Sequence, residues 1–363
     1  MHASTKNGSW RRKVERFVAF ALLALCLTSA IPAFAGYSKQ VLTFPAGASY
    51  GFPVPDHYEY AINVVHYENT APCIHAKTIF MVHGFGDNSG VFEPLAIALI
   101  NSGKACHVLA MDLPAHGASQ VSTDTRFGPR IWGTIDVDEY TMCLDQVLTT
   151  LYKKQNVPID TIVGHSTGGL AIQRLQSKYM GQLSSIQSKF GITKTILLAS
   201  DIPGALPWAS GDAPISMGYA KGLVVSYAQT LPAPYGTRVP LDYGTYIALK
   251  YSVNNMPVSG APTSREALLL NNPEPYAAAA NIVGLDPSGA TTATVPRLDV
   301  APGLWSGLNL IVAWPSQDLF FSQSEMDGLA NYLKPGTQAV VVSDPEAVHL
   351  IQYTKPQLLL PLF

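Results

Sequence analysis

The chain has 363 residues, of which 47% are hydrophobic and 13% are charged, and its formal net charge is −2. This length suffices for one large α/β domain or two small ones, and the apolar content argues against a disordered chain. Lys and Arg number 23 against 25 Asp and Glu, and no basic stripe remains beyond the first 35 residues, so nucleic acid is not expected as a partner.

The first 35 residues have the pattern of a secretory signal peptide. A basic stretch over 11–16 precedes an apolar run over 17–30, and a small-x-small cleavage site precedes Gly36. An uncleaved anchor is the alternative, since 17–35 could nearly span a bilayer, but the small residues favour cleavage. We expect a secreted or periplasmic protein that meets a membrane only if this segment is retained.

Three cysteines remain after cleavage, which also removes five basic residues and one acid and leaves 18 Lys and Arg against 24 Asp and Glu, a net charge of −6. An odd number of cysteines allows at most one disulfide and one free thiol. Cys73 and Cys106 each precede an apolar strand-like run, so they could pair if those strands are neighbours. Cys143 lies on the apolar face of a predicted helix and is expected to be an inert core residue.

Strands are predicted first over 41–44 and 58–65, and the partial alternation of the second is typical of an antiparallel edge. From residue 78 onward short apolar runs alternate with helices, which predicts a mainly parallel central sheet flanked by helices, an α/β fold. The predicted strands of this part are 78–82, 107–111, 161–163, 195–198, 308–313 and 338–342. The predicted helices lie between Pro94 and Gly103, over 140–151, over 170–179 and around 325–333, and an amphipathic segment ends the chain.

The alternation stops over about 202–307, where Pro, Tyr, Ala and Gly are frequent and charges are few. An unbroken loop of that length would be exceptional, so we expect a cap of roughly one hundred residues inserted into a domain that spans 36–363. Its aromatic residues suggest an apolar pocket for an acyl chain, although the same composition suits a well-packed helical cap.

The stretch Thr161 to Leu170 raises the question of a nucleophile, because a short apolar strand runs through Gly-His-Ser-Thr-Gly into a helix. Ser166 would sit in strained backbone at the end of the strand, and glycines on either side would avoid collisions there. The N-terminus of the helix presents backbone N–H groups, so the N–H of Thr167 can serve a developing oxyanion. A plain turn between strand and helix is the alternative on these residues alone.

A serine hydroxyl needs a neighbouring base, and His349 is the single histidine that follows Ser166 in the chain. It comes after the predicted strand 338–342, at the edge of a parallel sheet where sites are built. A surface or helix-capping histidine is the alternative.

The orienting acid is predicted to be Asp318, which follows the predicted strand 308–313. Asp201, just past the predicted strand 195–198, is the main rival. Asp344 and Glu346 are weaker rivals because they share the loop of His349, and an exposed aspartate without a role is the remaining alternative.

A second oxyanion donor is expected after the predicted strand 78–82. There the chain reads His83-Gly84-Phe85-Gly86, and a Gly-rich turn could aim the Phe85 N–H at the same oxygen as the Thr167 N–H.

Together these pieces resemble the α/β-hydrolase superfamily over most of residues 77–355. The matching stretches are 83–86, 112–119, 164–169 and the loops of Asp318 and His349. The resemblance implies the order Ser166, Asp318, His349 for nucleophile, acid and base, with Phe85 and Thr167 supplying oxyanion N–H groups and the insertion acting as a variable cap.

The chain departs from the family pattern in two places. Pro114 and Ala115 stand where the family usually has Arg-Gly or similar, and some twenty residues over 119–137 lengthen the next connection. Neither departure touches the triad, although the long connection could shape the pocket.

These features predict a secreted serine hydrolase that cleaves carboxylic esters, of the lipase, carboxylesterase or lactonase kind, with a small-molecule or lipid-like ester as its substrate. An amidase or peptidase of the same fold and a non-catalytic binding protein are the alternatives. Related epoxide hydrolases and haloalkane dehalogenases use Asp where this chain has Ser166, so those activities are not expected.

No cofactor is expected, because neither a phosphate-binding loop nor a dinucleotide fingerprint occurs. No metal site is expected either, because the spacing of the histidines does not follow a ligand pattern; these are His57, His66, His75 and His107. His83 and His116 are expected to hold loops beneath the site, and His165 to be a packing residue.

Overall fold

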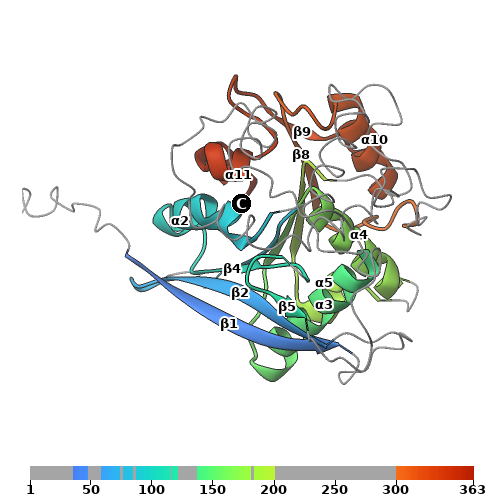
Figure 1. Ribbon diagram of the computed structural model, residues 1–363. Helices are drawn as coiled ribbons and strands as arrows, with labels where there is room; N and C mark the ends of the chain where they lie inside the picture. Colours follow the sequence, from blue (N-terminus) through green and yellow to red (C-terminus); the bar gives the residue numbers. More distant parts are fainter. Residues whose placement is uncertain are drawn as a thin grey trace, which may run out of the picture. The chain divides into compact units, whose positions relative to one another are not determined.

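The computed structural model describes residues 36–47, 59–73, 77–84, 87–114, 116–121, 137–180, 184–200 and 300–363 (Figure 1). The chain divides into Met1–Gly36 and Tyr37–Phe363, and every described residue except Gly36 belongs to the second unit. The expected signal segment, most of the expected cap, the rival acid Asp201 and the oxyanion candidate Phe85 lie outside the described residues.

One sheet of nine strands runs through the described part of the chain. Across the sheet the order is β1 (Tyr37–Gly47), β2 (Glu59–Asn69), β4 (His107–Met111), β3 (Thr78–Val82), β6 (Thr161–His165), β7 (Lys194–Leu198), β8 (Leu310–Pro315) and β9 (Val340–Val342), and β5 (Gln120–Val121) pairs with β2 beside this path. The pairs β1–β2 and β2–β4 are antiparallel, and all pairs from β4 to β9 are parallel. The predicted mainly parallel sheet with an antiparallel edge is therefore confirmed.

The central strands are apolar on both faces because both faces are covered. Every residue of β3 and β6 is buried. Successive side chains of a strand point to opposite faces, so Phe80 and Val82 join one core cluster while Ile79 and Met81 join the other. This double burial explains why these strands read as unbroken apolar runs rather than as an alternating pattern.

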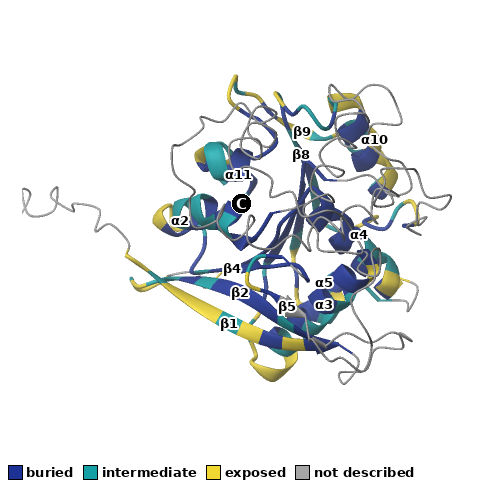
Figure 2. Ribbon diagram, viewed as in Figure 1, coloured by how far each residue is buried: buried dark blue, intermediate teal, exposed yellow. Residues whose placement is uncertain are grey.

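Helices cover the two faces in separate groups (Figure 1). One core cluster contains residues of α3 (Val137–Thr149), α4 (Thr167–Met180), α5 (Ile186–Phe190) and α10 (Gln323–Leu333). The other contains residues of η2 (Ser89–Phe92), α2 (Glu93–Asn101), α11 (Ile351–Thr354) and η6 (Pro356–Leu362). Figure 2 shows the central strands and the inner faces of α2 and α4 buried, whereas much of β1 is exposed.

The helix ends follow the local signals in the sequence. Pro94 lies in the first turn of α2, and Gly103 has a φ of +70°, a left-handed conformation that glycine adopts without strain. Ser322 and Glu325 form a capping box at the start of α10. A π-helical turn, η4 (Thr150–Lys154), continues α3.

Several details differ from the sequence expectation, and most element bounds shift by a few residues. Helix α5 was not predicted, because five residues are too few to show a helical period. Strand β5 lies inside the long connection over 119–137, where no strand was predicted, and β9 is shorter than the predicted 338–342. Neighbouring strands, rather than local composition, decide where such short strands end.

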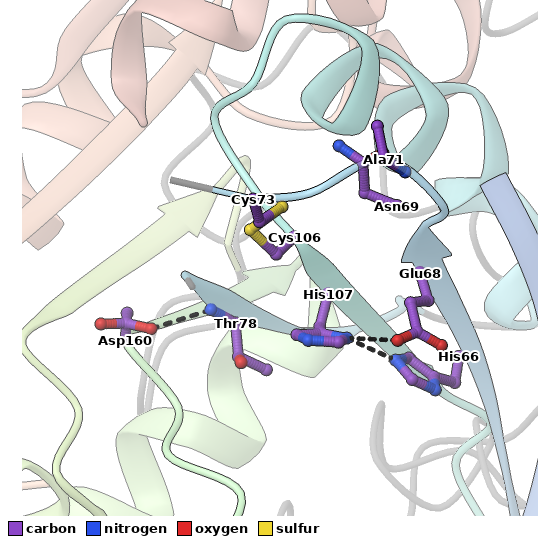
Figure 3. The surroundings of a disulfide bond; sticks show 9 residues. All are labelled: His66, Glu68, Asn69, Ala71, Cys73, Thr78, Cys106, His107 and Asp160. Carbon is purple, nitrogen blue, oxygen red and sulfur yellow. Dashed lines mark hydrogen bonds and ion pairs between the residues drawn. A yellow bond between two sulfur atoms is a disulfide. The ribbon is translucent and has the colours of Figure 1, made fainter. Parts of the chain in front are cut away.

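Cys73 and Cys106 form a disulfide that joins the segment between β2 and β3 to the residue before β4 (Figure 3). Cys106 directly precedes β4, and its carbonyl accepts a hydrogen bond from the N–H of Asn69 at the end of β2, with a separation of 2.9 Å. Cys143 is free and buried in α3. Within the ranges given above, no helix combines the length and apolar character needed to cross a membrane.

Candidate active site

Ser166 occupies the sharp turn between β6 and α4. Its φ is +51°, a left-handed conformation that non-glycine residues rarely adopt and that marks local strain. The Ser166 N–H donates to the carbonyl of Leu198 in the adjacent strand at 3.1 Å, and its carbonyl accepts from the Gly169 N–H at 2.9 Å. The residue is therefore fixed on both sides at the carboxyl end of a parallel strand, where α/β sheets build their sites.

The glycines around Ser166 are required by close backbone contacts. A Cβ atom added at Gly168 would lie 2.3 Å from the carbonyl oxygen of Val82, at the end of β3. One at Gly164 would lie 2.5 Å from the Cα of Gly169. One at Gly84 would lie 2.6 Å from the Cβ of Ser166 itself. Because these approaches leave no room for a side chain, the Gly-x-Ser-x-Gly pattern is a packing requirement of this turn.

Asp318 and His349 meet in the loops that follow β8 and β9. The Nδ1 atom of His349 lies 2.8 Å from Oδ2 of Asp318, whose side chain is fully buried. The other carboxylate oxygen accepts backbone N–H groups from Phe320 at 2.7 Å and Phe321 at 3.2 Å. A carboxylate held in this way keeps the proton of the imidazole on Nδ1, so Nε2 of His349 is left with its lone pair.

The loops that carry these two residues are joined by backbone hydrogen bonds. The Gln317 N–H donates to the carbonyl of Ala347 at 2.8 Å, and the Ser316 N–H donates to that of Val342 at 3.1 Å. The position of the acid relative to the base is thus set by the backbone as well as by the side chains.

The weaker rival acids are engaged elsewhere. Asp344 accepts the N–H of Glu346, two residues on in the same loop, at 2.8 Å. The Glu346 carboxylate forms an exposed ion pair with Lys355. Among the predicted acids that the structure describes, Asp318 is the one that contacts His349.

His165, next to Ser166, connects the serine turn to the histidine loop. Its Nε2 donates to the backbone carbonyl of His349 at 2.9 Å, and the two imidazole centroids are 4.6 Å apart. Burial, together with the neighbouring His349, holds the pKa of His165 well below its usual value, so this ring is neutral. The sequence suggested only a packing role for His165, although its place beside Ser166 was a usable signal.

Two aromatic rings lie against the imidazole of His349. The ring centroid of Phe320 is 4.6 Å away and that of Phe321 is 5.7 Å away. Sequence reasoning did not single out these residues, although both directly follow the loop of the predicted acid.

Two buried histidines support the floor of the site, as the sequence predicted for His83 and His116. Nε2 of His83 accepts the N–H of Leu113 at 3.0 Å, and its Nδ1 donates to the Gly84 carbonyl at 2.7 Å. Nδ1 of His116 donates to the carbonyl of Pro114 at 2.9 Å, and burial lowers the pKa of His116 to about 3. His83 thus links its own loop to the loop that follows β4, whereas His116 holds that second loop internally, with its ring centroid 5.1 Å from that of His83.

Asp112 is a buried anchor for the loop that follows β4. Its carboxylate accepts N–H groups from Ser89 at 2.6 Å, Ala118 at 2.9 Å and the Asn63 amide at 2.7 Å. Burial raises the pKa of Asp112, while these hydrogen bonds oppose the shift. A Cβ atom at Gly117, whose φ is +53°, would lie 2.4 Å from this carboxylate, so glycine is required there.

A sequence profile described as "Alpha/beta hydrolase family" matches residues 79–357. No curated protein matches the chain. Among solved structures, the chain is similar to a candidate lipase from Acinetobacter baumannii at 19% identity, with 90% of each chain covered and a TM-score of 0.56.

Two further structures have other activities in their names. An esterase from Thermogutta terrifontis is 18% identical, with 88% of this chain and 94% of that chain covered and a TM-score of 0.51. A haloalkane dehalogenase from Bradyrhizobium elkani is 12% identical, with 88% and 94% covered and a TM-score of 0.55. At these identities the similarity demonstrates a shared fold, and the chemistry has to be argued from the site.

Proposed function

The chain belongs to the alpha/beta hydrolase family, and on that premise we propose that it is a serine hydrolase that cleaves carboxylic esters through an acyl-enzyme. The observation that carries the proposal is the 2.8 Å contact between His349 and the buried Asp318, joined to the Ser166 turn through His165. A buried carboxylate, an oriented imidazole and a serine in strained backbone are the three parts that nucleophilic catalysis by a hydroxyl requires.

In the proposed reaction, Oγ of Ser166 attacks the ester carbonyl while Nε2 of His349 takes the hydroxyl proton. The carbon–oxygen bond to the alcohol then breaks, and His349 returns the proton to the leaving alcohol. Water, activated by the same imidazole, hydrolyses the acyl-enzyme and restores Ser166. Asp318 stabilises the imidazolium that forms in each half of the reaction.

The oxyanion is proposed to bind at the start of α4. Thr167 is the first residue of that helix, and the positive end of the helix dipole favours a developing negative charge there. Phe85 is proposed as the second donor because it follows Gly84, whose backbone packs directly against Ser166.

Serine at position 166 favours ester hydrolysis over dehalogenation, the reaction in the name of the structure from Bradyrhizobium elkani. A hydroxyl nucleophile with a paired base suits attack on an acyl carbon, and the rings of Phe320 and Phe321 beside His349 provide apolar surface near the reacting atoms. An amidase or peptidase would use the same residues and is the second candidate.

The chain is further proposed to act outside the cytoplasm. The leader pattern in the first 35 residues supports secretion, and the disulfide between Cys73 and Cys106 is typical of an oxidising compartment. Recovery of a mature form beginning at Gly36 from the periplasm or medium, identified by N-terminal sequencing, is the expected outcome. A cytoplasmic protein with residues 1–35 retained would contradict this part of the proposal.

The chemistry is tested with p-nitrophenyl esters of short and long acyl chains and with a fluorophosphonate probe. Wild-type protein should hydrolyse the esters and be labelled, and Ser166→Ala should lose both properties while keeping the wild-type circular dichroism spectrum. Labelling at Ser166 without ester turnover would favour the amidase. The absence of both labelling and turnover would favour a binding protein.

A further inference from the structure

We propose that His66, Glu68 and His107 form a binding site for a divalent transition-metal ion, with Zn²⁺ as the best-matched ion. The three residues are separated in sequence, but the antiparallel pairing of β2 with β4 sets Glu68 directly opposite His107. His66 and Glu68 are two positions apart on β2 and therefore lie on the same face of the strand. Figure 3 shows the three side chains pointing toward one another.

The ligand atoms have the separations that a zinc ion needs. Nε2 of His66 is 3.1 Å from Nδ1 of His107, and Nδ1 of His107 is 4.0 Å from a carboxylate oxygen of Glu68. One ligand atom from each residue can be chosen so that all lie within 4.8 Å of one another. Tetrahedral zinc with Zn–N distances of about 2.0–2.1 Å places two imidazole nitrogens about 3.3 Å apart, so the spacing of these two nitrogens already suits the ion. The two rings face each other and would turn to aim both lone pairs at the ion.

The donor set also selects the class of ion. Two imidazoles and one carboxylate suit Zn²⁺ and its transition-metal neighbours, whereas Ca²⁺ and Mg²⁺ prefer oxygen ligands. Side chains of His107 and Glu68 are 33% and 41% exposed, so an ion can enter and a water molecule can complete the coordination.

Binding does not require a net change in protons when both rings are neutral. Between the two facing nitrogens, 3.1 Å apart, one hydrogen atom is shared in the metal-free state. A metal ion would take both lone pairs, and the hydrogen of that ring would move, through solvent exchange, to the nitrogen that faces away from the ion.

The surrounding backbone is held in place before any ion arrives. Cys106, directly before His107, is cross-linked to Cys73, and its carbonyl accepts the N–H of Asn69, directly after Glu68. Ligands on such a constrained pair of strands lose little freedom on binding, which favours affinity.

The site lies away from the proposed catalytic residues. His107 is the first residue of β4, whereas Ser166 follows the last residue of β6, and both strands run parallel to β3. The two sites are therefore at opposite ends of the parallel strands. A metal at His107 would link β2 to β4 and stabilise the edge of the sheet without entering the reaction.

Isothermal titration of the untagged mature chain with ZnCl₂ tests the site, since a histidine tag would bind zinc itself. We expect one ion per chain, and a rise in the thermal midpoint with Zn²⁺ because the ion binds the folded state. His66→Asn, His107→Asn and Glu68→Gln should each weaken binding by at least the roughly 10–100-fold typical of lost metal-site partners. Glu93→Gln, which removes an exposed carboxylate paired with Lys39, is the matched control and should bind as the wild type does.

A second measurement uses the wild-type protein alone, so its result does not depend on whether the variants fold. Co²⁺ added to the wild-type protein should give the visible absorption of a tetrahedral nitrogen- and oxygen-ligated site, and Zn²⁺ should abolish it. No heat and no thermal shift with the wild type would overturn the proposal. Undiminished zinc binding in both histidine variants would also overturn it, since the ion would then bind elsewhere.

Discussion

Nε2 of His165 donates a hydrogen bond to the backbone carbonyl of His349, with the two atoms 2.9 Å apart. Through this contact the residue beside the proposed nucleophile holds the loop of the proposed base. The two residues are 184 positions apart in the sequence, so their alignment depends on tertiary contacts such as this one. His165 is accordingly proposed as a positioning residue, which acts through the backbone of His349.

Replacing His165 tests that role. The loss of one neutral hydrogen bond, worth about 0.5–1.5 kcal/mol, should lower kcat for His165→Ala by about 2- to 13-fold with little change in KM. His165→Gln can present an amide donor near the position of Nε2 and should recover part of the rate. Steady-state kinetics on a p-nitrophenyl ester, with circular dichroism as a check of folding, measure this. Wild-type kinetics in His165→Ala would remove the positioning role.

Asp318→Asn tests the assignment of the acid. An amide at this position cannot hold the proton on Nδ1 of His349 as a carboxylate does, so kcat should fall on the order of 10³–10⁴-fold. Asp344→Asn is the matched control, because the Asp344 carboxylate accepts the Glu346 N–H within its own loop and an amide oxygen can still accept it. Comparison of kcat for Asp318→Asn and Asp344→Asn tests whether Asp318 is the acid. A small effect in Asp318→Asn would return attention to Asp201.

Gly84→Ala should damage activity through a steric clash. The new methyl group would lie 2.6 Å from the Cβ of Ser166 and 3.0 Å from Nδ1 of His165, so the serine must shift. A displacement of this kind can cost about 100-fold in rate, and overpacking should lower the free energy of unfolding by about 1–3 kcal/mol.

Gly328→Ala is the matched control for this substitution. Gly328 lies inside α10 with open space around its Cβ position, so alanine should stabilise the protein by about 0.5–1 kcal/mol without altering kinetics. Urea unfolding and kcat/KM of both variants give the comparison. If Gly84→Ala were as harmless as Gly328→Ala, the close packing against Ser166 would be wrong.

Acid should destabilise the fold through its buried neutral histidines. The folded-state pKa of His116 is about 3, far below its ordinary value of 6.5, because burial disfavours the charged ring. Below pH 6.5 the unfolded chain therefore binds a proton that the folded chain does not bind, and stability falls as the pH falls toward 3. The limiting slope is about 1.4 kcal/mol per pH unit for each such histidine. His165, whose pKa is also lowered, acts in the same direction.

Urea denaturation between pH 8 and pH 5 measures this dependence. The free energy of unfolding should change little above pH 7 from this cause and should decline below pH 6.5. His116→Asn, which keeps a donor near the position of Nδ1, should be less stable at pH 7 but should show a slope shallower by about 1.4 kcal/mol per pH unit. An unchanged slope in this variant would contradict the low pKa of His116.

Much of the fold could be predicted because periodicity and helix-end signals are local. Strands β3 and β4 were predicted with their observed bounds, and α2 follows its Pro94 and Gly103 signals. The turn at Ser166 could also be predicted, since a strand, a glycine-flanked serine and a helix occupy a few consecutive residues. The catalytic role of that serine stays a prediction until it is tested.

The sequence by itself determined the alternation of strands and helices and a short set of polar residues at strand ends, because both depend on neighbours within a few positions. Only the tertiary structure decided that Asp318 rather than Asp344 or Glu346 meets His349, that Cys73 joins Cys106, and that His66 faces His107. These contacts depend on strand order and register, which arise from the packing of the whole sheet between its two helical layers. The spacing of these residues along the chain does not predict the contacts.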